Sequence, residues 1–178
     1  MKRPQIESWT TDAEAAELVR LAAGRRVLEI GTYKGFGAVL MAQAGATVWA
    51  VDWHRGDGDL GATDTLCGWW TNVRRHQVED RVIGLVGRAE TVLPMLRRHQ
   101  WDMAFIDGYH EYEAVRRDIA LAVPLVRRRG GLLVFHDYCH VWPGVVRAVD
   151  EMRAQLERWN AVGWSVVDSL AVATLRAS

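Results

Sequence analysis

The stretch Arg26-Val-Leu-Glu-Ile-Gly-Thr-Tyr-Lys-Gly35 joins a short apolar run to a loop that contains two glycines. Residues 26–30 have the pattern of a buried strand, and residues 36–44 predict a helix that stops at Gly45. Residues 47–51, Thr-Val-Trp-Ala-Val, then predict a second strand. Strand, glycine loop, helix and strand in this order form a βαβ unit, in which the two strands lie parallel.

The same alternation continues on both sides of this unit. Before it, Thr11-x-x-Glu14 is a capping box and predicts the start of a helix. Further strands are predicted at residues 81–86, 101–106, 131–135, 164–167 and 170–174. Helices are predicted around residues 90–98, at residues 111–123, and from two apolar stripes at helical spacing: Leu66, Trp69, Trp70 and Val73, then Val145, Val149, Met152 and Leu156.

This order of elements predicts the fold class. Five strand–helix alternations with right-handed crossovers indicate an α/β, Rossmann-like, doubly wound sheet of seven mostly parallel strands. Asp168-Ser169 predicts a tight turn, so the last two strands form a C-terminal antiparallel hairpin. No linker or repeat interrupts residues 1–178, which we expect to form a single domain.

Composition narrows the class of protein. Lys plus Arg and Asp plus Glu each number 22, so no net field favours nucleic acid or an acidic membrane surface. Cys67 and Cys139 are the only cysteines, which excludes a disulfide framework and suits a reducing compartment. No apolar run has the length of a signal peptide or a membrane span. We therefore expect a cytoplasmic protein that binds neither nucleic acid nor membrane.

Acidic residues end the first two strands, beside the glycine loop. Glu29 lies in the end of the first strand, Gly31 and Gly35 follow four residues apart, and Asp52 ends the second strand. The glycine spacing is not that of a dinucleotide loop, and a carboxylate there suits a ligand with positive charge and hydroxyls better than a pyrophosphate. The alternative is structural: Glu29 pairs with an arginine and Asp52 caps a loop. The combination favours a nucleoside site over an NAD-binding oxidoreductase.

These residues carry a family resemblance. Glu29-Ile-Gly31-Thr32-x-x-Gly35, followed by Val51-Asp52, resembles the class I S-adenosylmethionine-dependent methyltransferases. The resemblance implies that Gly31 and Gly35 let the backbone approach the methionine part of the cofactor, that Glu29 lies near its amino group, and that Asp52 holds its ribose. It also implies adenine contacts just after the third strand. The expected cofactor site is therefore Glu29, Gly31, Thr32, Gly35, Asp52, Trp53, Arg88, Ala89 and Asp107.

A second group of ionisable residues follows the fourth and fifth strands. Asp107 and His110 follow one strand, and His136 and Asp137 follow the other, so the two ends are expected to meet beside the cofactor site. Asp107, His136 and Asp137 form a candidate metal set, with His110 as a candidate general base. Adjacent strand residues point to opposite faces, so His136 and Asp137 can ligate together only where the strand bends. In the structural alternative, Asp107 belongs to a turn, His136 to the core and His110 to a helix cap.

The surrounding motifs sharpen the resemblance. Ile106-Asp107-Gly-x-His110-x-Tyr-Glu and Gly130-Gly-Leu-Leu-Val-Phe-His136-Asp137-Tyr resemble the small-molecule O-methyltransferases that include macrocin-type enzymes and cephalosporin-hydroxylase-like proteins, over about residues 25–155. The resemblance implies Mg²⁺ on Asp107 and Asp137 and the role of base for His110. His136 stands where those enzymes often have an acid, which tilts the site toward Mn²⁺ or Fe²⁺, or toward no metal.

Together these features predict an S-adenosylmethionine-dependent O-methyltransferase that acts on a hydroxyl of a sugar or natural product. Trp53, Trp69, Trp70 and Trp142 are expected near the acceptor site, and at least one of Trp69 and Trp70 in the core. The loop at residues 53–62 is expected to close over the cofactor. A metal-free N-methyltransferase and a non-catalytic accessory protein that binds the cofactor remain alternatives. The oligomeric state is left open, with a homodimer as one alternative.

Overall fold

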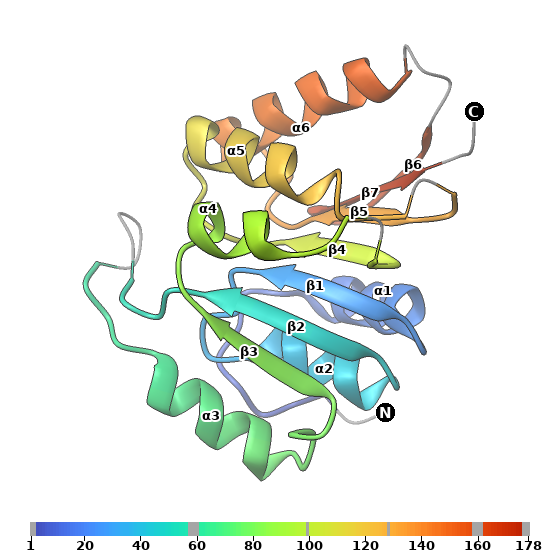
Figure 1. The fold of residues 1–178 in the computed structure, drawn as a ribbon. Helices are drawn as coiled ribbons and strands as arrows, with labels where there is room; N and C mark the ends of the chain where they lie inside the picture. Colours follow the sequence, from blue (N-terminus) through green and yellow to red (C-terminus); the bar gives the residue numbers. More distant parts are fainter. Residues whose placement is uncertain (1–2, 57–60, 99, 128, 158–161, 176–178) are drawn as a thin grey trace.

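The computed structural model describes residues 3–56, 61–98, 100–127, 129–157 and 162–175. Within these residues, seven strands form one sheet in the order β3-β2-β1-β4-β5-β7-β6 (Figure 1). Strands β1 to β5 are parallel, and β7 runs antiparallel between β5 and β6. The strands are β1 (Arg26–Ile30), β2 (Thr47–Asp52), β3 (Val82–Val86), β4 (Met103–Ile106), β5 (Leu132–Phe135), β6 (Val162–Val167) and β7 (Leu170–Leu175). The predicted fold class and C-terminal hairpin are confirmed.

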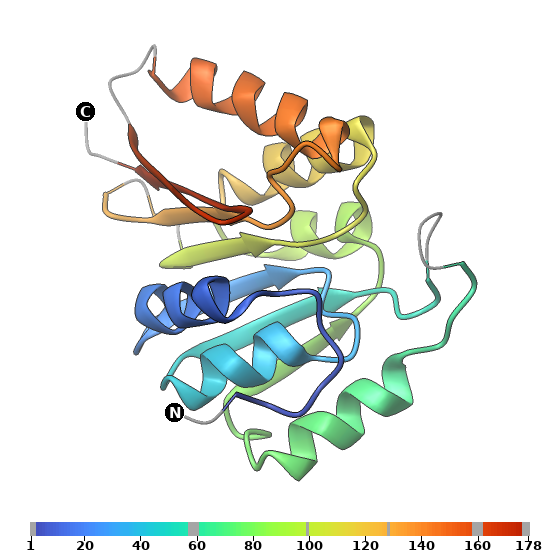
Figure 2. The same cartoon turned by 180° about the vertical axis from the view of Figure 1, so that it is seen from behind.

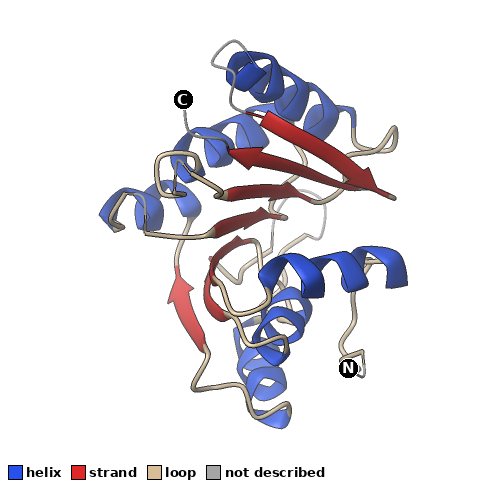
Figure 3. Cartoon of the chain, turned by 90° about the vertical axis from the view of Figure 1, so that its right-hand side faces the viewer, coloured by secondary structure: helices blue, strands red, loops and turns tan. Residues whose placement is uncertain are grey.

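Helices cover both faces of the sheet, as the edge-on view in Figure 3 shows. They are α1 (Asp12–Ala22), α2 (Phe36–Gln43), α3 (Leu66–Arg75), α4 (Ala89–Val92), the 3₁₀ turn η1 (Leu93–Met95), α5 (Tyr112–Ala122) and α6 (Pro143–Glu157). Helices α1, α2 and α3 contribute to the core on one face (Figure 2), and α5 and α6 pack together on the other. This two-sided cover is what doubly wound topology requires.

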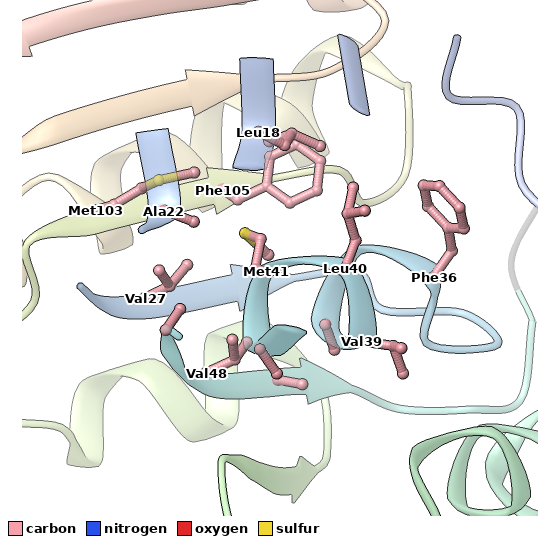
Figure 4. Packing of buried hydrophobic residues seen from close by; sticks show 14 of the residues in the cluster. Leu18, Ala22, Val27, Phe36, Val39, Leu40, Met41, Val48, Met103 and Phe105 are labelled. Carbon is pink, nitrogen blue, oxygen red and sulfur yellow. The ribbon is translucent and has the colours of Figure 1, made fainter. Parts of the chain in front are cut away.

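The period of the strands divides the core into two layers. Val27 and Met103 face the α1–α2 side, where Leu18 and Met41 pack against them (Figure 4). The next residue in each strand belongs to the opposite layer, with α5 and α6. Successive strand residues point to opposite faces, so a parallel sheet with two covered faces needs apolar residues at nearly every position.

Several element boundaries differ from the sequence prediction by one or more residues. The fourth strand begins at Met103 rather than at residue 101, because Trp101 forms only an isolated bridge with Val126. The helix expected around residues 90–98 ends early, at Val92, and continues as the η1 turn, which contains Pro94. Proline lacks the N–H that an α-helix needs there. Residues 57–60 of the loop expected to close over the cofactor lie outside the described residues.

The strand order places a switch point between β1 and β4. The chain proceeds outward from β1 to β2 and β3, then returns to β4 and proceeds to the other side. Loops that follow β1 and β4 therefore diverge and leave a crevice at the carboxyl ends of these strands, where ligands bind in such sheets. None of the helices in the described parts of the chain combines the length and apolarity that crossing a bilayer takes.

Candidate active site

A cavity of about 800 Å³ opens at this switch point. Its walls come from the loops that follow β1, β2, β3, β4 and β5 and from the segment at residues 7–10 before α1. Residues predicted for the cofactor and residues predicted for catalysis line the same cavity: Glu29, Gly31, Thr32, Asp52, Trp53, Arg88, Ala89, Asp107, His110, His136 and Asp137. Of the positions predicted from the sequence, Gly35 is not part of the lining.

The glycine loop is held by close backbone contacts. Gly31 has φ +83°, and a Cβ atom on it would lie 2.2 Å from the carbonyl oxygen of Asp107. Gly35 has φ +90° at the start of α2, and a Cβ atom on it would lie 3.0 Å from the Trp69 ring. Only glycine combines this left-handed backbone with such close packing. The loop that follows β1 is thereby fixed against the end of β4.

Asp52 fastens the other side of the loop. Its Oδ2 accepts hydrogen bonds from the backbone N–H groups of Thr32 and Tyr33, at 2.9 and 2.8 Å. Its Oδ1 accepts one from the N–H of His54, at 2.7 Å. These contacts show that Asp52 caps the loop, as the structural alternative expects. The Asp52 carboxylate also lines the cavity. A carboxylate oxygen can accept more than one bond, so Oδ1 retains capacity for a ligand hydroxyl.

Glu29 is a buried carboxyl group with an unmet hydrogen bond. The residue is 1% exposed, and its Oε2 atom has no hydrogen-bond partner. Burial raises the pKa of Glu29 to about 8, against hydrogen bonds from Thr32 and the Ala38 backbone that lower it. Gly37 leaves room for the side chain, because a Cβ atom there would lie 2.2 Å from Oε1. A buried polar atom without a partner is costly, and this one belongs to a residue that lines the cavity.

Trp53 and Arg88 form a flat wall beyond Asp52. The Arg88 guanidinium lies 4.2 Å from the centre of the Trp53 ring, and the indole Nε1 donates to the carbonyl of Gly56 at 3.0 Å. Arg88 precedes α4, and Ala89 begins it. An aromatic face with a fixed orientation suits a planar heterocycle. Arg88 and Ala89 follow β3, where the adenine contacts are expected, and that role stays a prediction.

Asp107, His136 and Asp137 come together as the sequence predicts. His136 Nδ1 lies 3.1 Å from Asp107 Oδ1 and 2.9 Å from Asp137 Oδ2. Strand β5 ends at Phe135, and Asp137 has φ +59°, in the left-handed region that Asp tolerates better than most residues. The chain has therefore turned after His136, and the geometric objection to two adjacent ligands does not apply.

The protonation of this cluster follows from its burial and its charges. Burial opposes a charge on His136, yet Asp107, Asp137 and Glu14 together raise its pKa far above the usual value. Burial likewise opposes ionisation of Asp137, and hydrogen bonds from His110 and His136 prevail, so its pKa is lowered. Loss of solvent raises the pKa of Asp107, and the charge of His136 only partly offsets this. The cluster attracts positive charge strongly.

His110 stands between this cluster and an aromatic wall. Its Nε2 lies 3.0 Å from Asp137 Oδ2, and its ring stacks on Trp142 with 4.1 Å between centroids and 21° between planes. Helix α5 takes Glu111 as its N-cap residue, without a side-chain cap bond. The N-cap residue of α5 is therefore Glu111 and not His110. The alternative of a plain core histidine fails for His136, because carboxylates surround both of its ring nitrogens.

The four tryptophans expected near the acceptor site divide between the core, the outer surface and the cavity. Trp69 is 4% exposed, and its Nε1 donates to Thr32 Oγ1 at 3.1 Å, so it braces the glycine loop from the core. Trp70 is exposed and stacks on Trp69. Trp53 and Trp142 line the cavity. The prediction that at least one of the two adjacent tryptophans belongs to the core is confirmed.

Three residues that line the cavity or contact its lining were not predicted as site residues from the sequence. Glu14 was visible only as part of a capping box, yet its Oε2 lies 3.3 Å from His136 Nε2. Asp118 is 6% exposed, and its Oδ1 has no hydrogen-bond partner; its place within the Asp-Gly-x-His motif region was the available signal. Trp9, which is 64% exposed, lines the cavity from the segment before α1, and no local pattern marks it.

Comparisons with known proteins agree with this geometry. A family model described as a methyltransferase domain matches residues 28–138. A curated relative, the catechol O-methyltransferase of Mycobacterium tuberculosis, is 31% identical over an alignment 166 residues long, and the match covers 75% of this chain and 70% of that protein.

Solved structures show the same fold at lower identity. The O-methyltransferase TomG from Streptomyces achromogenes, solved in complex with S-adenosylmethionine, has a TM-score of 0.74 at 21% identity, covering 94% of this chain and 81% of TomG. The O-methyltransferase NovP has a TM-score of 0.77 at 21% identity, covering 93% of this chain and 80% of NovP. The family model spans more than half of the chain. The chain therefore belongs to the S-adenosylmethionine-dependent O-methyltransferases and is a methyltransferase enzyme.

Proposed function

We propose that this domain, residues 1–178, transfers a methyl group to a hydroxyl of a small molecule that carries a flat ring, such as a sugar or an aromatic natural product. The observation that carries the proposal is the shared cavity: Glu29 and Asp52 line it together with Asp107, His110 and Asp137. A cofactor site and an acid–base cluster that open into one space permit direct transfer between two bound molecules.

The residues for the cofactor are assigned from their contacts. S-adenosylmethionine supplies a methyl group on a positively charged sulfur. The unpartnered Oε2 of Glu29 would accept a hydrogen bond from its amino group, and Asp52 Oδ1 would accept one from a ribose hydroxyl. Gly31 gives room for its methionine part, while Trp53, Arg88 and Ala89 would flank the adenine. Thr32, Gly35 and Asp107 complete the site by holding the loop in place.

A divalent cation fits the cluster at Asp107, His136 and Asp137. One donor atom from each residue lies within 4.8 Å of the others. Neighbouring ligands of a six-coordinate Mg²⁺ or Mn²⁺ ion stand about 3 Å apart, which is close to the two distances from His136 Nδ1, 3.1 and 2.9 Å. Such a cation would supply positive charge that eases loss of the proton from the acceptor hydroxyl. The mixed nitrogen and oxygen donors favour Mn²⁺ as much as Mg²⁺.

We assign His110 as the base that accepts the proton of the acceptor hydroxyl. The Asp137 carboxylate faces its Nε2, and Trp142 fixes the plane of its ring, so the imidazole is oriented from two sides. Its ring also lines the cavity, where an acceptor would lie. A base held in one orientation needs little reorganisation to accept a proton as the new carbon–oxygen bond forms.

The acceptor end of the cavity favours a flat, partly apolar molecule. Trp9 and Val141 are 64% and 60% exposed, and both line the cavity together with Trp142. Large apolar side chains exposed in a cavity typically mark a binding surface. Rings with hydroxyl groups, such as sugars and phenols, match both this wall and the carboxylates beside it.

Two measurements test the proposal. Calorimetric titration with S-adenosylmethionine should show binding, and the absence of binding at millimolar cofactor would refute the cofactor site. A screen of sugars, phenols and catechols, with S-adenosylhomocysteine as the product measured, should identify an acceptor. With that acceptor, His110→Ala should lower turnover about 10²- to 10⁴-fold and leave cofactor affinity within about threefold.

Controls separate the base from the metal. His140→Ala changes an exposed histidine that does not line the cavity, and it should leave turnover unchanged. Asp107→Asn should weaken binding of Mn²⁺, and a chelator should lower turnover of the unmodified enzyme. Full activity in a chelator would refute the metal assignment and favour a metal-free reaction. Near-normal turnover of His110→Ala would refute the assignment of the base.

A further inference from the structure

Glu14 is a buried carboxylate in the first turn of α1 that touches the catalytic cluster. The residue is 1% exposed, although its helix lies on the surface of the α1–α2 layer (Figure 2). Its Oε2 accepts a hydrogen bond from the Thr11 N–H at 2.8 Å and faces His136 Nε2 at 3.3 Å. Its Oε1 accepts from the N–H and Oγ of Ser169, at 2.8 and 2.6 Å.

Capping alone does not account for this arrangement. In a capping box the glutamate needs to accept only one hydrogen bond, from the N–H of the N-cap residue. The rest of its carboxylate can stay exposed to water. Here the second oxygen ties the turn between β6 and β7 to α1, and Oε2 also meets a histidine 122 positions along the chain. A carboxylate gives up its hydration at considerable cost, so its buried position requires partners that are themselves fixed.

The contact determines which nitrogen of His136 faces the cluster. A carboxylate oxygen accepts, so Nε2 of the ring must carry a proton, toward Glu14, whether or not Nδ1 is protonated as well. Nδ1 then points at Asp107 Oδ1 and Asp137 Oδ2. A carboxylate behind a metal-binding histidine fixes the ring and its tautomer in this way, and removal of such a group usually costs about 10- to 100-fold in metal affinity.

We propose that Glu14 is a positioning residue, which holds His136 with Nε2–H toward α1 and Nδ1 toward Asp107 and Asp137. Its consequence for metal affinity rests on the cation site proposed above, but the orientation of His136 does not. The proposal also gives α1 and the β6–β7 turn a part in the active site, because both hold the Glu14 carboxylate.

Glu14→Gln separates the role of Glu14 in capping α1 from its role in orienting His136. Every contact of the carboxylate is with a group that can donate, and an amide replaces one acceptor oxygen by a donor NH₂. Where the NH₂ faces His136, it requires an acceptor at Nε2, and the neutral ring then carries its proton on Nδ1. Thr11→Ala is the matched control, because it removes the two bonds of Thr11 Oγ1, from the Glu14 N–H and to Asp168 Oδ2, and leaves the contact between Glu14 and His136.

The test combines ¹⁵N NMR of the histidine rings with Mn²⁺ titration followed by electron paramagnetic resonance. In the unmodified protein and in Thr11→Ala, we expect a protonated Nε2 on His136, assigned by the signals that His136→Gln removes. In Glu14→Gln, we expect that signature to change and the Kd for Mn²⁺ to rise about 10- to 100-fold relative to Thr11→Ala. Affinity for S-adenosylmethionine should stay within about threefold in both variants.

The outcomes distinguish this proposal from the one on which it builds. If Glu14→Gln and Thr11→Ala have the same His136 signals and the same Kd for Mn²⁺, Glu14 serves only the fold and the proposal is overturned. If the unmodified protein binds no Mn²⁺, the cation site fails, and the NMR comparison alone decides the role of Glu14. If Glu14→Gln does not fold, Glu14→Asp retains the charge and shortens the reach by one methylene. The shorter carboxylate no longer reaches Nε2, so the Nε2–H signal of His136 is expected to shift, and an unchanged signal would overturn the proposal.

Discussion

Glu29→Gln should make the cofactor-free protein more stable at neutral pH and lower the affinity of the protein for S-adenosylmethionine. The residue is 1% exposed, one of its oxygens has no partner, and burial raises its pKa from 4.5 to about 8. The unfolded chain therefore loses this proton near pH 4.5, whereas the folded chain keeps it until about pH 8. Between these values the folded state binds more protons, so the stability contributed by Glu29 falls as the pH rises.

The difference between pH 7 and the unfolded-state pKa of 4.5 sets the size of the effect of Glu29 on the free energy of unfolding. At about 1.4 kcal/mol per pH unit, the cost of Glu29 reaches at most about 3.5 kcal/mol at pH 7 and is below about 1 kcal/mol at pH 5. The glutamine carries no such pH dependence, but its buried amide without a partner costs about 1–2 kcal/mol at every pH. The variant should therefore be less stable than the unmodified protein at pH 5 and more stable at pH 7.

Urea unfolding of the cofactor-free proteins at pH 5, 6, 7 and 8 measures this difference. The exposed Glu79 supplies the control, because Glu79→Gln removes one negative charge without any buried group and should give a difference that hardly varies with pH. A stability difference for Glu29→Gln that stays constant from pH 5 to pH 8 would refute the reasoning, since it would mean that Glu29 ionises normally in the folded chain.

Cofactor binding provides a second measurement of the ionisation of Glu29. An ammonium group beside Glu29 would stabilise its ionised form, so at pH 7 binding of S-adenosylmethionine should release close to one proton from the unmodified protein. Calorimetry in two buffers of different ionisation enthalpy counts that proton. Glu29→Gln should release none and bind about 10- to 100-fold more weakly, because a hydrogen bond to a charged group is lost. Equal proton release from both proteins would show that the cofactor does not meet Glu29.

Three further predictions concern other parts of the cavity. Burial raises the pKa of Asp118 from 3.8 to about 7, so its contribution to stability falls as the pH rises between these values; Asp118→Asn should add up to about 3 kcal/mol in urea unfolding at pH 7 and little at pH 4. Gly31→Ala should cost about 2–4 kcal/mol in the same assay and abolish cofactor binding in calorimetry, because the new Cβ atom would overlap the Asp107 carbonyl at a left-handed backbone position. Trp142→Ala should lower kcat/KM about 3- to 10-fold by releasing the ring of His110, with Trp142→Phe closer to normal; equal values for both variants would show that stacking does not position the base.

Much of the fold follows from signals within single segments. The alternation of strand and helix, the capping box at Thr11 and the turn at Asp168 each depend on a few neighbouring residues, and all three are present in the structure. The boundaries that moved are those where a local signal competes with another, as at Pro94. Periodicity predicts that an element exists better than it predicts where the element stops.

The candidate site was predictable where a residue's position in the topology sufficed. In a doubly wound sheet the carboxyl ends of the strands meet at one edge, so strand-final Glu29, Asp52 and Asp107 were expected to share a site, and they line one cavity. Residue type then suggested the chemistry of the ligand. No tertiary contact had to be known for either step.

The sequence by itself determined the sheet, the glycine loop and the acidic residues that surround the cavity, because these depend on spacing along the chain. Only the tertiary structure decided how Asp137 turns into the cluster, that Trp9 reaches the cavity, and that Glu14 faces His136 across 122 positions. Such contacts depend on how α1 and the β6–β7 turn pack beside the end of β5, and packing between distant segments leaves no periodic trace in the sequence. The sequence thus located the chemistry, and packing set the orientation of the groups that carry it out.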